Sequence, residues 1–309
     1  MSKILKIGTR GSALALWQAR HVAHQLESLH EDLKTELVIY KTMGDHILDR
    51  PLAEIGGKGL FTKELEVALL DGDIHLAVHS LKDMPTALPE GLILGAIPVR
   101  ADVRDCLLTR RTDVHQPKII GTASLRRGAL AHRRLQDPTI RSIRGNVETR
   151  MNRLFAEDES RCDGVLLAMA GLIRLELNKT RTDVAFLPLN PEHFIPAVGQ
   201  GALAIECAEN DAWTRGLLAA IHHEATARCV QAERRFLAGV EGSCRVPVGG
   251  YATCDRENIR LKAFVANIDG SLYLEEIIMG TEPESVGQQA ADRLLERGAG
   301  DILKSLLGE

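Results

Sequence analysis

Short apolar runs alternate with amphipathic segments over the first two-thirds of the chain. The chain opens with an apolar run at 4–8 that is typical of a strand, and Ser12 can cap the helix whose apolar positions follow at helical spacing. The same criteria predict strands at 36–40, 74–78, 92–97, 118–121, 140–143, 164–168 and 202–207, and helices at 60–70, from 124 and from 146. This β-α-β rhythm predicts parallel-rich sheets flanked by helices.

The last third of the chain has a different pattern. A long predicted helix at 224–238 precedes strands at 248–254, 259–266 and 272–279, and helices follow at 283–296 and 301–307. Helices that bracket an antiparallel meander indicate a separate small α+β domain. We therefore expect an α/β fold in three domains. The predicted domains are 1–98 plus 199–219, 99–198 and 220–309, the last being the α+β domain.

Composition and cysteine usage limit the class of protein. Of the 309 residues, 45% are hydrophobic and 26% are charged, as in ordinary globular proteins. No apolar run approaches the roughly 20 residues that span a bilayer, and the first residues lack the features of a signal peptide. The six cysteines form no C-x-x-C pair, which argues against a zinc ribbon or a redox motif. We therefore expect a cytoplasmic protein with no membrane contact and mostly free thiols.

Positive charge is concentrated between residues 126 and 153. This stretch carries eight arginines, two acids and no aromatic residue, in a chain of net charge −4. A planar guanidinium holds a carboxylate or phosphate in a fixed geometry. Two predicted strand-to-helix junctions, at 121–124 and 142–146, lie beside or within this stretch, and helix N-termini at strand ends are natural anion sites. The arginines at these junctions are predicted to bind an anion: Arg126, Arg127, Arg144 and Arg150. Three of the other arginines fit a solvated face: Arg133, Arg134 and Arg153.

Nucleic acid is the alternative ligand for this arginine-rich stretch. Single-strand binders usually interleave aromatic stacking platforms with positive charge, and this stretch has none. The rest of the chain is acidic, which is unfavourable for a protein that binds a phosphate backbone. Small ligands with several carboxylates fit better, so no nucleic-acid partner is expected.

Two further segments offer charged groups. Lys82 and Asp83 directly follow a predicted buried strand, so they present a carboxylate at its end, although an ordinary surface ion pair gives the same pattern. The glycine-rich segment at 56–59 lacks the spacing of a P-loop and offers Lys58 to an anion.

Cys244 lies in a glycine-flanked loop beside Arg245, which would favour its thiolate. It is a candidate nucleophile or covalent anchor, and the alternative is a passive small apolar residue. The run at 222–224, two histidines and a glutamate, suggests a metal site at first sight. Adjacent helical residues project about 100° apart and do not chelate together easily, so no metal is expected.

Eight segments, in order along the chain, resemble the porphobilinogen deaminase family. They are I-G-T-R-G-S-A-L-A (7–15), G-G-K-G-L-F (56–61), H-S-L-K-D-M-P (79–85), G-T-A-S-L-R-R (121–127), R-S-I-R-G-N-V-E-T-R (141–150), A-M-A-G-L-I-R (168–174), P-A-V-G-Q-G-A (196–202) and E-G-S-C-R-V-P-V-G-G (241–250). One such segment would be weak evidence, whereas eight in order make chance agreement improbable. The resemblance covers essentially the whole chain.

The resemblance implies two domains like periplasmic binding proteins and a small C-terminal domain that carries a cysteine. It also implies a dipyrromethane cofactor joined through a thioether to Cys244. The implied reaction, in tetrapyrrole and heme biosynthesis, condenses four molecules of porphobilinogen with loss of ammonia and releases hydroxymethylbilane by hydrolysis. Each pyrrole bears an acetate and a propionate, so the growing chain needs cationic partners in fixed positions. No long apolar stripe demands a dimer, and we expect a monomer.

Roles for individual residues follow from the same motif matches. Asp83 is implied as the catalytic carboxylate, which stabilises the positive charge that develops as ammonia leaves and moves protons. Residues implied to bind the cofactor are Cys244, Ser80, Lys82, Thr122, Ser124, Arg126, Arg127 and Arg144. Residues implied to bind the substrate are Arg10, Ser12, Lys58, Arg144, Arg150, Arg174 and Gln200.

Three positions depart from the usual pattern of the family. Glu54 stands where many relatives have a basic residue, Ala123 replaces a common serine, and Ser243 replaces a glycine before the cysteine. The alternative from another class is a non-catalytic anion-binding protein of the same fold. The expected lack of a signal peptide and the reactive-loop cysteine both count against that alternative.

Overall fold

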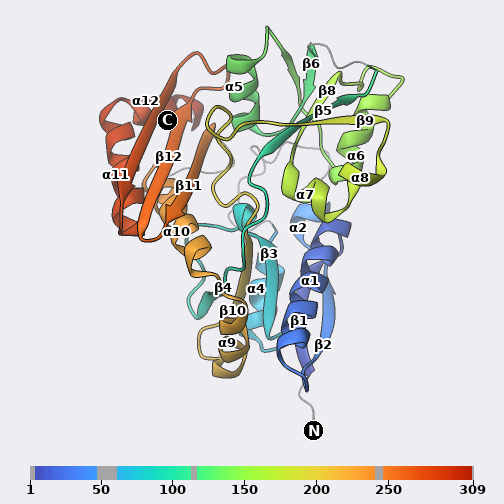
Figure 1. Cartoon of the computed structure of the whole chain (residues 1–309), viewed down its shortest axis with the longest axis vertical. Coiled ribbons are helices and arrows are strands. Elements are labelled where there is room, and N and C mark those ends of the chain that lie inside the picture. The colour runs from blue at the N-terminus through green and yellow to red at the C-terminus, as the bar shows by residue number, and fades with distance from the viewer. Residues whose placement is uncertain (1–3, 47–60, 113–116, 241–245, 308–309) are drawn as a thin grey trace. The chain divides into compact units, whose positions relative to one another are not determined.

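The computed structural model describes residues 4–46, 61–112, 117–240 and 246–307, which group into two compact units (Figure 1). The first unit holds the described residues up to 46 together with 61–101 and 201–227. The second holds 102–112, 117–200 and the described residues from 228 onward.

The first unit is built on a five-stranded sheet with the strand order β2-β1-β3-β10-β4. β1 runs parallel to β2 and β3, whereas β10 runs antiparallel to β3 and β4. Its strands are β1 (Ile4–Arg10), β2 (Lys34–Tyr40), β3 (Leu76–Ser80), β4 (Leu92–Ala96) and β10 (Leu203–Ala208). Its helices are α1 (Ala13–Leu29), α2 (Met43–His46), α4 (Lys63–Leu70), α9 (Ala212–Leu218) and the short 3-10 turns η1 (Leu81–Asp83) and η3 (Ala219–Ile221).

The two faces of β3 pack against different helices. Leu76 and Val78 lie in a core with Leu26 of α1, whereas Ala77 lies in a core with Leu65 of α4. Successive side chains of a strand point to opposite faces, so this alternation is what a buried central strand requires. The sheet is therefore covered on both faces, which explains the continuous apolar character of its strands.

The second unit contains a second five-stranded sheet, with the order β7-β6-β8-β5-β9. Its strands are β5 (Asp105–Arg110), β6 (Ile119–Gly121), β7 (Thr139–Arg141), β8 (Gly164–Ala168) and β9 (Val184–Pro188). The accompanying helices are α5 (Leu125–Arg134), α6 (Val147–Met151), η2 (Asn152–Phe155), α7 (Met169–Arg174) and α8 (Leu177–Thr180). β6 is parallel to β7 and β8, and β5 is antiparallel to β8 and β9. In both five-stranded sheets, therefore, the fourth strand in the order runs antiparallel to its two neighbours, and the first three strands are parallel.

The second unit also contains the antiparallel meander β11-β12-β13. Its elements are α10 (Glu224–Gly239), which begins in the first unit, β11 (Val248–Asp255), β12 (Asn258–Ala266), β13 (Tyr273–Gly280), α11 (Pro283–Glu296) and α12 (Ala299–Leu307). Phe264 of β12 shares a core with Leu130 of α5 and Leu166 of β8. Arg133 donates to the carbonyl of Gly270 over 3.0 Å and stacks over the Tyr273 ring. This shared core explains why the meander and the second five-stranded sheet belong to one compact unit.

The predicted fold class is confirmed, with two α/β sheets and a small C-terminal α+β part. Two strands, β5 and β9, lie where no strand was predicted, and β5 and β10 introduce antiparallel pairs into sheets expected to be parallel-rich. The three domain boundaries remain predictions. Among the described helices, none is both long and apolar enough to cross a membrane.

Candidate functional site

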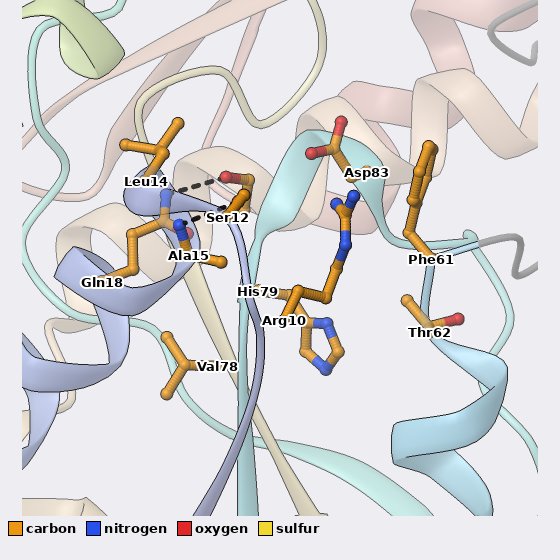
Figure 2. Close-up of a pocket in the computed structure, with 11 residues that line it drawn as sticks. Arg10, Ser12, Leu14, Ala15, Gln18, Phe61, Thr62, Val78, His79 and Asp83 are labelled. Carbon is orange, nitrogen blue, oxygen red and sulfur yellow. Dashed lines mark hydrogen bonds between the residues drawn. The ribbon is translucent and has the colours of Figure 1, made fainter. Parts of the chain in front are cut away.

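A polar pocket lies at the C-terminal ends of β1 and β3 in the first unit (Figure 2). Its lining brings together four residues that the sequence predicted for the site: Arg10, Ser12, Ser80 and Asp83. Parallel strands open their carboxyl ends at one edge of a sheet, so residues distant in sequence meet there.

The backbone around Asp83 is fixed by two buried neighbours. Leu81 is 1% exposed and donates its N–H to the carbonyl of Ala202 over 3.0 Å, and Met84 is 6% exposed and donates to the carbonyl of Leu81 over 3.1 Å. With both apolar side chains buried, the tight turn η1 leaves Asp83 exposed and Lys82 half-buried. The carboxylate is thus presented on a rigid turn.

Arg10, at the end of β1, extends toward the same space as Asp83 (Figure 2). Its guanidinium carbon lies 4.2 Å from the centre of the Phe61 ring, which is a cation–π contact. A guanidinium held by its face keeps its hydrogen-bonding edges in a defined plane. Phe61 is the last residue of the motif at 56–61, but no binding role was predicted for it from the sequence.

The two serines of the pocket are held by partners of their own. Ser12 caps α1, and its Oγ accepts the N–H of Ala15 over 3.3 Å. Ser80 Oγ accepts a hydrogen bond from Gln18 Nε2 over 2.8 Å. Both hydroxyls are therefore oriented before any ligand binds.

In the second unit, Arg126 and Arg127 converge on Asp105. Arg126 Nη1 lies 2.7 Å from Asp105 Oδ2, and Arg127 Nε lies 2.8 Å from Oδ1. The side-chain amide of Gln200 donates to the same Oδ1 over 3.1 Å, and Gln200 accepts a hydrogen bond from Arg127 Nη2. Burial alone would raise the pKa of Asp105, but the two guanidinium groups hold it well below its usual range. Asp105 was not among the predicted site residues, although an acid at the start of a short apolar run was a visible signal.

This network shows that Arg126 and Arg127 have a partner within the protein. Both are nearly buried, at 4% and 6% exposure, and their donors also reach the carbonyls of Ile195 and Leu166. The structure places them inside the protein, bound to an internal carboxylate. Their predicted role, and that of Gln200, as ligands of pyrrole carboxylates stays a prediction.

In the turn after β6, the side-chain hydroxyls accept hydrogen bonds from backbone N–H groups of the same turn. Thr122 Oγ1 accepts the N–H of Ser124 over 3.1 Å, and Ser124 Oγ accepts the N–H of Arg127 at the start of α5. Ala123 between them is exposed, so the departure from the family's serine removes a hydroxyl at the surface of this turn.

The next junction, after β7, holds Arg144 and Arg150. Arg150 Nε donates to the carbonyl of Gly145 over 2.6 Å, and Gly145 has a φ of +107°, which favours glycine. Arg144 Nη1 is buried and has no hydrogen-bond partner among the described residues. Arg174, at the end of α7, is 8% exposed, and burial lowers its pKa to about 10.

The family model described as porphobilinogen deaminase, dipyromethane cofactor binding domain, matches residues 5–216, and the one described as porphobilinogen deaminase, C-terminal domain, matches 227–296. The chain belongs to the porphobilinogen deaminase family. It is 48% identical over 312 residues to a porphobilinogen deaminase of Syntrophotalea carbinolica, covering 99% of this chain and 96% of that protein. It is 44% identical to that of Bacillus pumilus (97% and 96% covered) and 43% identical to that of Listeria monocytogenes (99% and 99%). The family predicted from the motifs, and its role in tetrapyrrole synthesis, are confirmed.

The dipyrromethane of the porphobilinogen deaminase family carries carboxylates, so its site needs donors that the protein leaves unpaired. Arg144 Nη1 is such a donor, because it is buried without a hydrogen-bond partner among the described residues. In the first unit taken by itself, the pocket of Arg10 and Asp83 offers a cation and a carboxylate suited to acidic side chains and pyrrole N–H groups. The residues present therefore fit this cofactor. Two predicted site residues, Lys58 and Cys244, and two departures, Glu54 and Ser243, lie outside the described residues.

Proposed function

We propose that this chain joins four porphobilinogen molecules, with loss of one ammonia at each addition, and releases hydroxymethylbilane by hydrolysis. Asp83 is the catalytic carboxylate of this reaction, and Cys244 is the point of cofactor attachment. The chain acts as a monomer in the cytoplasm and needs no nucleic-acid partner. The observation that carries the proposal is an exposed carboxylate on a rigid turn, inside a pocket that also contains an oriented guanidinium.

The chemistry calls for this combination of groups. When the aminomethyl nitrogen leaves porphobilinogen as ammonia, it takes the C–N electron pair, and the pyrrole becomes electron-poor. The Asp83 carboxylate stabilises that positive charge next to the pyrrole N–H and can accept the proton lost when the ring regains aromaticity. The dipyrromethane, when bound, supplies the free pyrrole carbon from which the chain grows.

The cationic residues bind and orient the substrate. Arg10 is held in plane by Phe61 and can grip an acetate or propionate through its fork. Arg144 has a buried donor aimed at no protein acceptor in the described chain, which suits a second carboxylate. Lys82, Arg150 and Arg174 add positive charge, and their individual roles stay predictions.

The decisive experiment is the intact mass of the purified protein, measured with turnover of porphobilinogen. We expect a mass above that of the sequence by one dipyrromethane, a positive colour reaction with an acidic Ehrlich-type reagent, and loss of both in Cys244→Ala. A folded, active protein without added mass would contradict the cofactor proposal. A protein that binds porphobilinogen but releases no ammonia would instead support the anion-binding alternative.

A further inference from the structure

Three titratable side chains meet beneath the pocket of Asp83, in the interface between the sheet of the first unit and α4. They are His79 of β3, Glu206 of β10 and Glu66 of α4, and they are 6%, 0% and 8% exposed. His79 shares the face of β3 with Ala77, which packs on α4. Figure 2 shows the His79 ring below the Arg10 side chain, and both residues line the pocket.

His79 and Glu206 form a buried pair. Nε2 of His79 lies 3.2 Å from Oε2 of Glu206, and their side chains share one face because Ala204, two residues before Glu206, is the register partner of His79. Apart from this ion pair, neither oxygen of Glu206 has a hydrogen-bond partner among the described residues. A fully buried carboxylate is very unfavourable without a proton or a cation beside it. His79 is the neighbour that can supply it.

Glu66 adds a second buried carboxyl group to the cluster. Burial raises its pKa, and repulsion from Glu206 adds to this effect. The other titratable groups around it are Arg10 on β1, Glu64 on α4 and Asp83 in η1, and β4 carries none.

We propose that His79 is a positioning residue of the pocket, and that its pairing with Glu206 keeps the wall beneath Arg10 free of net negative charge. The pocket must admit a substrate with two carboxylates, and an unpaired buried carboxylate below Arg10 would repel them and compete for its guanidinium. This inference rests on the proposed function only in the identity of the substrate.

The test is a double-mutant rescue. His79→Gln leaves Glu206 without its partner, so the KM for porphobilinogen should rise about three- to tenfold relative to wild type. The double variant, His79→Gln with Glu206→Gln, removes the charge and should return the KM to within about twofold of wild type. Ratios to wild type at each pH cancel the ionisation of the substrate itself.

Stability supplies a readout that is independent of turnover. His79→Gln leaves the buried carboxyl group of Glu206 without its partner, so at neutral pH this variant should be less stable than wild type. The double variant removes both members of the pair and should recover most of this loss. Glu36→Gln, the same substitution at an exposed position of β2, is the control and should leave KM and stability unchanged.

A KM increase of equal size in the single and double variants, or no increase at any pH, would overturn the proposal. Should His79→Gln not fold, Glu66→Gln provides the alternative: its KM should fall below that of wild type at the alkaline end, and a ratio that stays flat would count equally against the proposal. Release of hydroxymethylbilane by wild type in the same assay reports on the proposed function, separately from these ratios.

Discussion

Arg126 Nη1 lies 2.7 Å from Asp105 Oδ2, and both side chains are buried, at 4% and 0% exposure. Arg126, which was predicted to face a ligand, thus lies inside the protein and pairs with an internal carboxylate. Arg127 approaches the other carboxylate oxygen, so one acid holds two adjacent guanidinium groups at the start of α5. This arrangement fixes the position of both arginines at the end of β6 and ties α5 to β5.

Removing the shared acid should unfold the second unit more easily. Asp105→Asn leaves two buried guanidinium groups without a counterion, and we expect a loss of about 3–5 kcal/mol in the free energy of unfolding. Asp183→Asn is the matched control, because Asp183 makes an equally close pair with Arg181 but is exposed, and we expect about 0–1 kcal/mol there. Denaturant unfolding measures both, and equal losses would contradict the assignment.

The same pair sets a pH dependence. The pKa of Asp105 is depressed in the folded protein, so its contribution to stability is complete above its unfolded pKa of about 4 and is lost as the pH falls below that value. The stability difference between wild type and Asp105→Asn should therefore be constant near neutral pH and shrink under acid conditions.

The sequence predicted the fold class because apolar periodicity follows directly from burial, and most strands lie within two residues of their predicted positions. It missed β5 and β9 for identifiable reasons. β5 begins with Asp105, whose charge is acceptable only because of Arg126 and Arg127, and β9 ends in Pro188. A pattern of apolar positions cannot show a charge that a distant helix neutralises.

For the candidate site, the motifs singled out Arg10, Ser12 and Asp83, and the structure shows that these three line one pocket, while their roles stay predictions. The motifs gave no sign of Phe61 behind Arg10, or of the pairing between His79 and Glu206, because both depend on which strands and helices become neighbours. Motif matching finds the residues that face a ligand more readily than those that support them.

Asp83→Asn should lower kcat by about 100- to 10,000-fold, since the amide can neither stabilise a developing positive charge nor accept a proton. Folding and cofactor mass should be unchanged, because Asp83 is exposed on a turn held by buried Leu81 and Met84. Asp71→Asn, at the exposed end of α4, is the control and should have full activity. A fully active Asp83→Asn protein would refute the catalytic role.

Phe61 should affect substrate binding rather than chemistry. Phe61→Leu removes the ring that supports the Arg10 guanidinium, and we expect the KM to rise about two- to fivefold with kcat nearly unchanged. Gly44→Ala offers an independent route, because a Cβ at that position would collide with the Phe61 ring and displace it. Both variants should shift KM in the same direction. Steady-state kinetics measure both constants, and a change confined to kcat would argue against a role of Phe61 in supporting Arg10.

Substitution by glutamine should lower the stability of the protein at Arg126 but not at Arg144. Arg126→Gln breaks a buried ion pair and should be strongly destabilising, whereas Arg144→Gln removes a buried donor that has no partner in the described chain and should leave stability nearly unchanged. If Arg144 binds a pyrrole carboxylate, Arg144→Gln should instead raise the KM for porphobilinogen by about tenfold or more. Unfolding curves and kinetics on both variants separate the two roles. An Arg144→Gln protein that is as stable and as active as wild type would leave that arginine without a function in binding.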